Sequence, residues 1–131
     1  VQQLINKLGL NASRYSFADG SGLSLYNYVS AELEVRLLRY AYSNQLILNH
    51  LLPALPIAGV DGTLKARMLS PFTRSNVRAK TGTVMGVSSL CGYLTASNGH
   101  QICFSIINQG IMHAKNGRRF QDRVCSILCR P

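Results

Sequence analysis

The sequence predicts an α+β fold, in which an antiparallel sheet of about three strands packs with helices that include a C-terminal helix. Apolar residues at helical spacing dominate the first part of the chain, and strand-like runs separated by turn residues dominate the second. Helices and strands that fall in separate blocks are typical of antiparallel α+β layers. The length of 131 residues and the apolar content of 47% suit one packed domain.

Three short elements are predicted in the first part of the chain. Residues 1–10 are predicted to be the end of a helix, and residues 14–18 a short strand. The D-G-S-G run at residues 19–22 is a turn by composition. Within it, Asp19 and Ser21 are expected to fix the turn through hydrogen bonds from side chain to backbone.

A helix of about 13 residues is predicted to begin after Ser30, whose hydroxyl is a favoured N-cap. Glu32 in its first turn suits the helix dipole and can pair with Arg36 one turn later. The apolar face is expected to comprise Leu33, Leu37 and Ala41.

The middle of the chain is predicted to be rich in loops, with a short helix at residues 63–68. The breaking residues are Pro53, Pro56, Gly59, Asp61 and Gly62. Strands are then predicted at residues 76–84, 88–96 and 101–108. Gly86 separates the first two strands, and an Asn-Gly turn at residues 98–99, a strong hairpin signal, separates the last two.

The last helix is predicted at residues 114–129. The side chains expected on its apolar side are Phe120, Val124, Ile127 and Leu128. No apolar run in the chain approaches the ~20 residues that span a bilayer, so no transmembrane segment is expected.

The formal charge is +9, from 14 Lys and Arg against five acidic residues. The dense group of cations comprises Lys115, Arg118, Arg119 and Arg123. A solvated helix face explains this group better than a nucleic-acid patch, because the other basic residues are scattered. Attraction to carboxylate-rich polymers is a third interpretation. We expect no nucleic-acid partner.

The four cysteines lack the paired spacing of a zinc site, so no metal or other cofactor is expected. Cys125 and Cys129 would share a helix face, and Cys91 and Cys103 fall in strand-like runs. Buried free thiols are the expected state. A bridge between Cys91 and Cys103 stays open as an alternative.

Lys80-Thr81-Gly82 is the K-T-G string typical of serine acyl-transfer enzymes that act on D-alanyl peptides and β-lactams. The ammonium of Lys80 and the hydroxyl of Thr81 suit a substrate carboxylate, because charge-assisted hydrogen bonds are strong. Gly82 leaves room for a peptide against the strand edge. The backbone N–H of Thr83 is expected to form half of an oxyanion hole.

Three further segments accompany this motif: D-G-S-G-L-S at residues 19–24, L-P-I-A-G-V-D-G-T-L at 55–64 and G-V-S-S-L at 86–90. With the R-A-K-T-G-T run at 78–83, they resemble the DacB-type, or class C, penicillin-binding proteins in order and spacing. The resemblance runs from about Asn11 to the final helix. It implies part of a serine β-lactamase/DD-peptidase, transpeptidase-like fold.

Two motifs of that family are absent. The family's nucleophile is the serine of S-x-x-K, and none of the four lysines here has a serine three residues before it. The S-x-N motif is also missing, because the run at residues 24–27 has one residue too many. Both motifs lie N-terminal to this segment in the family, so truncation explains their absence better than divergence. Residues 1–131 are therefore expected to be the C-terminal part of the penicillin-binding domain.

The resemblance implies that the parent protein is a serine-type D-Ala-D-Ala carboxypeptidase or endopeptidase of the periplasm or cell envelope. It would act on peptidoglycan stem peptides through an acyl-enzyme and be acylated by β-lactams, with the N-terminal remainder of its domain as a partner. The expected site comprises Lys80, Thr81 and Gly82 as catalytic residues, Thr83 for substrate and oxyanion, and Asp19 and Ser21 in a supporting loop. The chain alone is expected to be inactive.

Family members often carry an arginine after the D-G-S-G-L-S run, where this chain has Leu25, so the preferred stem-peptide residue is expected to differ. The alternative function is a non-catalytic module that uses the same residues only to bind a peptide or a partner. The isolated histidines are expected at the surface or in packing contacts: His50, His100 and His113.

Overall fold

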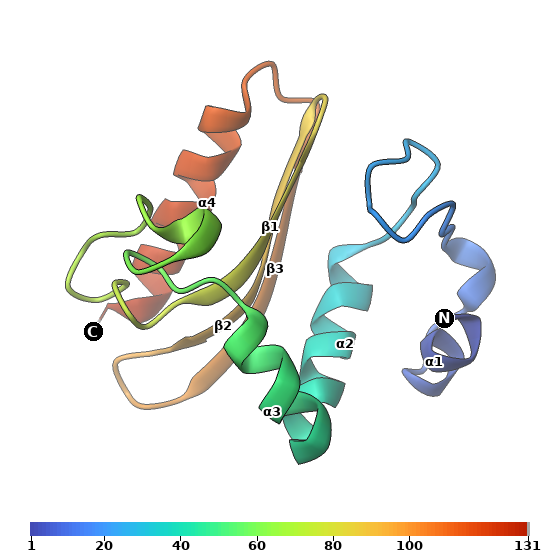
Figure 1. The fold of residues 1–131 in the computed structure, drawn as a ribbon, viewed down its shortest axis with the longest axis horizontal. Helices are drawn as coiled ribbons and strands as arrows, with labels where there is room; N and C mark the ends of the chain where they lie inside the picture. The colour runs from blue at the N-terminus through green and yellow to red at the C-terminus, as the bar shows by residue number, and fades with distance from the viewer. Residues whose placement is uncertain (131) are drawn as a thin grey trace.

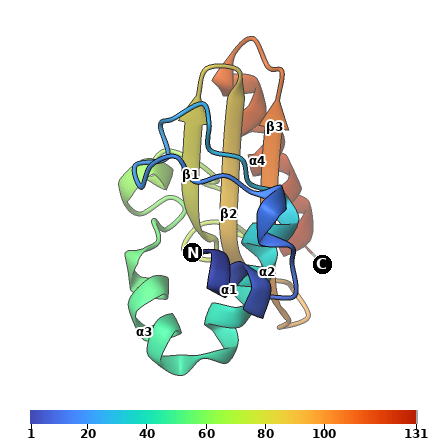
Figure 2. The same ribbon diagram turned by 90° about the vertical axis from the view of Figure 1, so that its right-hand side faces the viewer.

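The computed structural model describes residues 1–130 and confirms the α+β fold. The elements are α1 (Gln2–Lys7), η1 (Ala12–Arg14), α2 (Ala31–Ser43), α3 (Gln45–Ala54), η2 (Gly62–Leu64), β1 (Arg78–Val84), β2 (Val87–Thr95), β3 (Gln101–Gln109) and α4 (Ala114–Cys129), where η1 and η2 are 3₁₀ turns. The antiparallel sheet has the order β1-β2-β3. Helix α4 covers one face and α2 with α3 the other, while α1 lies beyond α2 (Figure 1 and Figure 2).

The three predicted strands are confirmed, with ends that differ by at most two residues. Glycines close both turns between them. Gly86 has φ +74° between β1 and β2, and Gly99 has φ +84° between β2 and β3. Glycine adopts such left-handed angles without steric cost, so the hairpins form where the sequence predicts them.

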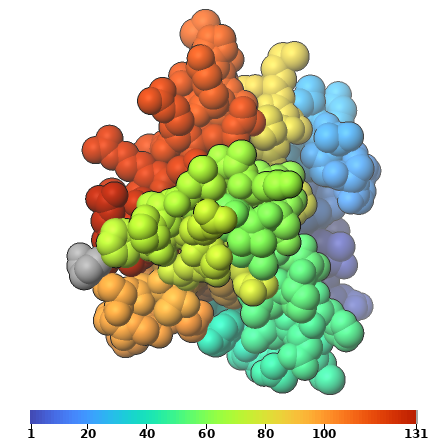
Figure 3. Space-filling view, turned by 60° about the vertical axis from the view of Figure 1, so that its left-hand side comes forward, coloured from blue at the N-terminus to red at the C-terminus, as the bar shows by residue number. Residues whose placement is uncertain are grey.

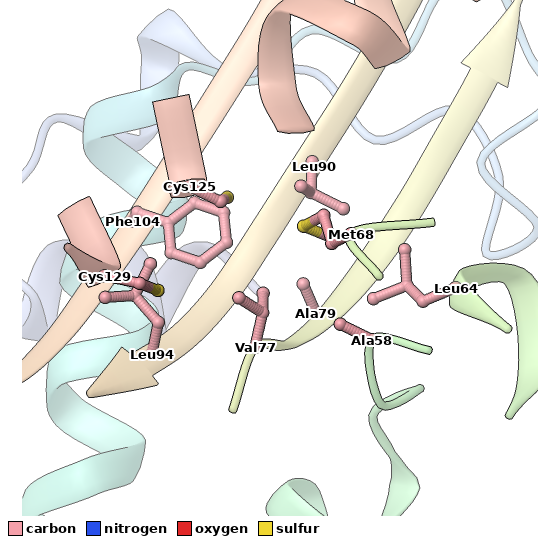
Figure 4. Close-up of a cluster of buried hydrophobic side chains, with 10 residues drawn as sticks. All are labelled: Ala58, Leu64, Met68, Val77, Ala79, Leu90, Leu94, Phe104, Cys125 and Cys129. Atoms are coloured by element: carbon pink, nitrogen blue, oxygen red, sulfur yellow. The ribbon is translucent and has the colours of Figure 1, made fainter. Parts of the chain in front are cut away.

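The main core lies between the sheet and α4 (Figure 4). It comprises Ala58, Leu64, Met68, Val77, Ala79, Leu90, Leu94, Phe104, Cys125 and Cys129. Residues 57–77 close this core and lie beside α4 at the surface (Figure 3). The ion pair between Arg67 and Asp122, with an N–O distance of 2.6 Å, joins this segment to the helix.

The buried side of α4 agrees with the prediction at Leu128, which packs against the main core, but differs at other positions. Phe120 and Ile127 are exposed, at 54% and 61% of their surface. The residues buried against the sheet are Gly117, Gln121, Cys125 and Cys129. Gln121 donates to Ser88 Oγ at 3.1 Å, so a satisfied amide occupies the core. A hydrophobic pattern does not reveal a buried position of this kind.

Helix α2 begins at the predicted N-cap, where Ser30 Oγ accepts a hydrogen bond from the N–H of Leu33. The predicted ion pair between Arg36 and Glu32 is confirmed at 2.7 Å. The apolar face was misplaced at one position, because Leu38 is buried and Leu37 is exposed.

Helix α3 was not predicted, since the middle of the chain was expected to be rich in loops, with Pro53 among its breaking residues. The side chain of Asn44 caps it by accepting from the N–H of Ile47. Pro53 lies in its last turn, next to the residue that ends the helix. Because proline has no N–H, it cannot donate to the carbonyl oxygen of Asn49 one turn earlier.

Two shorter predictions are only approximate. The strand predicted at residues 14–18 is reduced to a single bridge between Ser16 and Tyr28. The helix predicted at residues 63–68 is one 3₁₀ turn, η2. Within residues 1–130, no helix combines the length and the apolar character that crossing a membrane requires.

All four cysteines are free thiols. On the sheet, Cys91 lies opposite Ser105 and Cys103 lies opposite Tyr93, so the two cysteines are diagonal neighbours. Diagonal positions are about 7–8 Å apart, which exceeds the Cα separation that a disulfide spans. Burial raises the pKa of Cys91 and Cys125 to about 12, so neither thiol is ionised at neutral pH.

Candidate functional site

The K-T-G residues lie in β1, which is an edge strand of the sheet. Only the start of its outer edge is covered, where the N–H of Ala79 donates to the carbonyl oxygen of Pro56 at 3.0 Å. Backbone groups point alternately to the two sides along a strand, so the N–H groups of Thr81 and Thr83 point to this outer edge as well. Beyond Ala79, no strand of the described residues pairs with that edge.

Lys80 lies on β1 with its side chain exposed to solvent. Its Nζ donates to the carbonyl oxygen of Thr81 at 2.6 Å. That carbonyl belongs to the outer edge, so the hydrogen bond holds the ammonium beside the unpaired backbone. A positive charge at this place can bind an anionic group of a peptide that lies along β1.

Thr81 lies on the opposite side of the strand from Lys80, because successive side chains alternate. Its Oγ1 donates to Thr63 Oγ1 at 3.0 Å. Thr63 is not among the predicted site residues, although it belongs to the L-P-I-A-G-V-D-G-T-L run at residues 55–64. Thr63 is a predictable neighbour only once η2 is known to lie against β1.

The cross-strand neighbour of Gly82 leaves little room for a side chain at this position. A Cβ at Gly82 would lie 2.5 Å from Oγ of Ser89, which pairs with it on β2. Any larger residue therefore forces the Ser89 side chain to move.

The loop at residues 19–27 is organised by Asp19, as the sequence analysis expected of Asp19 and Ser21. Asp19 Oδ1 accepts from the N–H of Gly22 at 2.9 Å, and Oδ2 accepts from Ser21 Oγ and from the N–H of Ser24, both at 3.1 Å. The hydrogen bond from the Asn27 amide is the main cause that lowers the pKa of Asp19. Among the hydrogen bonds of residues 1–130, none joins this loop to β1.

The groups that Lys80 and Thr81 contact are other protein groups, with which they form hydrogen bonds. Lys80 Nζ bonds a backbone carbonyl and Thr81 Oγ1 bonds Thr63, so neither group hydrogen-bonds a serine among the described residues. Within residues 1–130, no three His, Cys, Asp or Glu side chains gather as metal ligands. An open strand edge that carries an ammonium and a hydroxyl has the chemistry to hydrogen-bond a carboxylate-bearing peptide.

The chain is similar in sequence and in fold to several D-alanyl-D-alanine carboxypeptidases. The chain is 40% identical over 106 residues to D-alanyl-D-alanine carboxypeptidase DacB of Haemophilus influenzae, covering 79% of this chain and 22% of that protein. It is 39% identical over 115 residues to a D-alanyl-D-alanine carboxypeptidase of Actinomadura sp. (strain R39), covering 84% of this chain and 21% of the relative.

A crystal structure of penicillin binding protein 4 (dacB) from Haemophilus influenzae matches the fold with a TM-score of 0.85 and 31% identity, covering 99% of this chain and 31% of that one. Another crystal structure of the same protein is complexed with a β-lactam. The chain spans about a fifth of the length of the two carboxypeptidases named above, from Haemophilus influenzae and Actinomadura. Residues 1–130 match the D-Ala-D-Ala carboxypeptidase 3 (S13) family. The chain belongs to this family.

Proposed function

We propose that the chain supplies the substrate-binding strand of a serine-type D-Ala-D-Ala carboxypeptidase or endopeptidase. The complete protein would act on peptidoglycan stem peptides through an acyl-enzyme and be acylated by β-lactams. The observation that carries the proposal is the exposed Lys80 beside Thr81 on an unpaired sheet edge. Family membership and the β-lactam complex of the Haemophilus protein support it.

The roles of the site residues follow from their positions on β1. A peptide that adds to the outer edge as an extra strand would bring its terminal carboxylate to the ammonium of Lys80 and the hydroxyl of Thr81. The N–H of Thr83 points to the same edge and would donate to the oxyanion of the tetrahedral intermediate. Gly82 keeps the strand free of a side chain between them.

We also propose that residues 1–131 form the C-terminal part of one penicillin-binding domain, whose remainder carries the nucleophile and covers β3. Strand β3 has an unpaired edge, and Ile102 and Ile106 on its α4 side are only half-buried. Arg67 occupies one flank of α4, and the exposed Phe120 and Ile127 lie on the opposite flank. A strand and a helix from the remainder would bury these side chains.

The cell envelope is the location that this proposal requires, since peptidoglycan is found there.

The alternative is a non-catalytic module that binds peptide along the same edge. It is favoured by the lack of any S-x-x-K motif in these 131 residues. The two candidates differ in whether the complete protein forms an acyl-enzyme.

Labelling with fluorescent penicillin tests the proposal. We expect a covalent adduct on the complete protein and none on the 131-residue chain. Mapping the labelled peptide should locate the adduct on a serine three residues before a lysine, outside the sequence described here. A complete protein that binds the antibiotic without a covalent adduct would favour the non-catalytic module.

A further inference from the structure

The contact between Thr81 and Thr63 joins the proposed substrate strand to a second, rigid element. Thr81 Oγ1 donates to Thr63 Oγ1 at 3.0 Å, and both hydroxyls lie near the surface. No other side-chain hydrogen bond is formed by either hydroxyl among the residues that the structure describes. The pair is therefore free to rearrange when a ligand reaches Thr81.

The backbone around Thr63 is fixed by several independent contacts. Asp61 Oδ1 accepts from the N–H of Ile57 at 2.7 Å, and the N–H of Gly59 donates to the carbonyl oxygen of Leu64 at 3.0 Å. The Leu64 side chain is fully buried in the main core. Gly62 has φ +50°, and a Cβ there would lie 3.1 Å from the Pro56 ring. The turn consequently presents the Thr63 hydroxyl at a defined place beside β1.

We infer that Thr63 is a positioning residue for Thr81, through which it strengthens the binding of the substrate's terminal carboxylate. This inference rests on the proposed function of β1. A hydroxyl carries one proton and two acceptor lone pairs. In the structure, the Thr81 proton is used on Thr63. When a carboxylate binds, Thr81 must donate to it instead.

The same pair of hydroxyls can accommodate that change by reversing its direction. Thr63 then donates its own proton to Thr81 Oγ1, and Thr81 donates to the carboxylate. A hydroxyl that accepts a hydrogen bond is polarised and becomes a better donor, so the two bonds reinforce each other. Thr63 also keeps the Thr81 side chain in the rotamer that faces the ligand. No covalent bond changes in this step.

The test uses the complete enzyme and a D-Ala-D-Ala peptide. Thr63→Val keeps the shape of the side chain and removes the hydroxyl. We expect KM to rise about three- to tenfold, the value of one net hydrogen bond, with kcat changed less than about twofold. Thr63→Ser should restore KM. Thr95→Val is the matched control, because the Thr95 hydroxyl bonds only Gln101 at the far end of β2, and it should leave KM unchanged.

A double-mutant cycle separates this role from a structural one. If Thr63 acts through Thr81, Thr63→Val should add no increase in KM once Thr81 is replaced by Val. An unchanged KM in Thr63→Val, an increase that persists in the Thr81→Val background, or a failure of Thr63→Ser to restore KM would overturn the inference alone. A complete protein that neither cleaves peptide nor reacts with penicillin would overturn the proposed function as well.

Discussion

The two outer strands of the sheet, β1 and β3, both leave one edge unpaired within residues 1–130, but their surroundings differ. The edge of β1 carries an exposed ammonium and hydroxyls that are held by a rigid turn. On the α4 side of β3, Ile102 and Ile106 are only half-buried, and Phe120 and Ile127 of α4 are exposed. A polar edge suits a peptide that binds and leaves, whereas an apolar edge suits a permanent contact within one domain.

The largest effect is expected at Lys80. In the complete protein, Lys80→Ala should lower the rate of acylation by penicillin about 10²–10³-fold, because a charged contact to the carboxylate is lost. The melting temperature should stay within about 2 °C of the unmodified protein, since this side chain is exposed. Near-normal acylation would remove Lys80 from the site.

Phe120 tests the proposed docking edge. In the complete protein, Phe120→Ala should lower the free energy of unfolding by about 2–3 kcal/mol. The reason is that Phe120, half-exposed within residues 1–130, would be buried by the remainder of the domain. Leu46→Ala is the control, as Leu46 is 79% exposed on α3, away from both edges, and it should cost less than about 0.5 kcal/mol. Equal and small effects in a denaturant titration would argue against docking at β3.

Gly82 distinguishes fit within the sheet from fit to a substrate. Gly82→Ala should lower the free energy of unfolding by about 1 kcal/mol, because its Cβ displaces the Ser89 hydroxyl from its rotamer. Gly82→Ala should also lower the rate of acylation by penicillin, because its methyl group would face the bound peptide. Adding Ser89→Ala should restore the stability but not this rate. Restoration of both would assign Gly82 a purely structural role.

The smallest effect is expected at Asp19, which lies in an exposed loop. Its pKa is lowered below the ordinary value of 3.8, chiefly by the Asn27 amide. A lowered folded-state pKa stabilises the fold above the unfolded pKa, and this stability is lost as the pH falls through the folded pKa. Asp19→Ala should therefore be less stable than the unmodified protein at pH 7, with a difference that shrinks below about pH 4. A difference that is independent of pH would exclude this electrostatic contribution.

Features set by local chemistry were predictable from the sequence. The strands, their glycine turns, the Ser30 cap and the bounds of α4 follow from periodicity and turn residues. The buried side of α4 did not, because Gln121 enters the core through hydrogen bonds to Ser88 and Asn108 that form only after the sheet has assembled. Helix α3 was missed because Pro53 within it, and Pro56 just after it, are residues that usually break helices.

The site also contains residues that were predictable from the sequence and contacts that were not. Lys80 on a strand with an exposed side chain was predictable from a motif of adjacent residues. Thr63, the neighbour of Thr81, was not predictable, since the two threonines in contact are 18 residues apart and meet only through the fold of η2. The Ser89 side chain that requires Gly82 depends likewise on the register of β1 with β2.

The central claim is that the outer edge of β1 binds the substrate's carboxylate. A crystal structure of the complete protein acylated by a β-lactam tests it most directly. We expect the antibiotic to lie along β1, with its carboxylate within hydrogen-bonding distance of the Thr81 hydroxyl and next to the Lys80 ammonium. An acylated structure in which the carboxylate lies away from both residues would contradict the account.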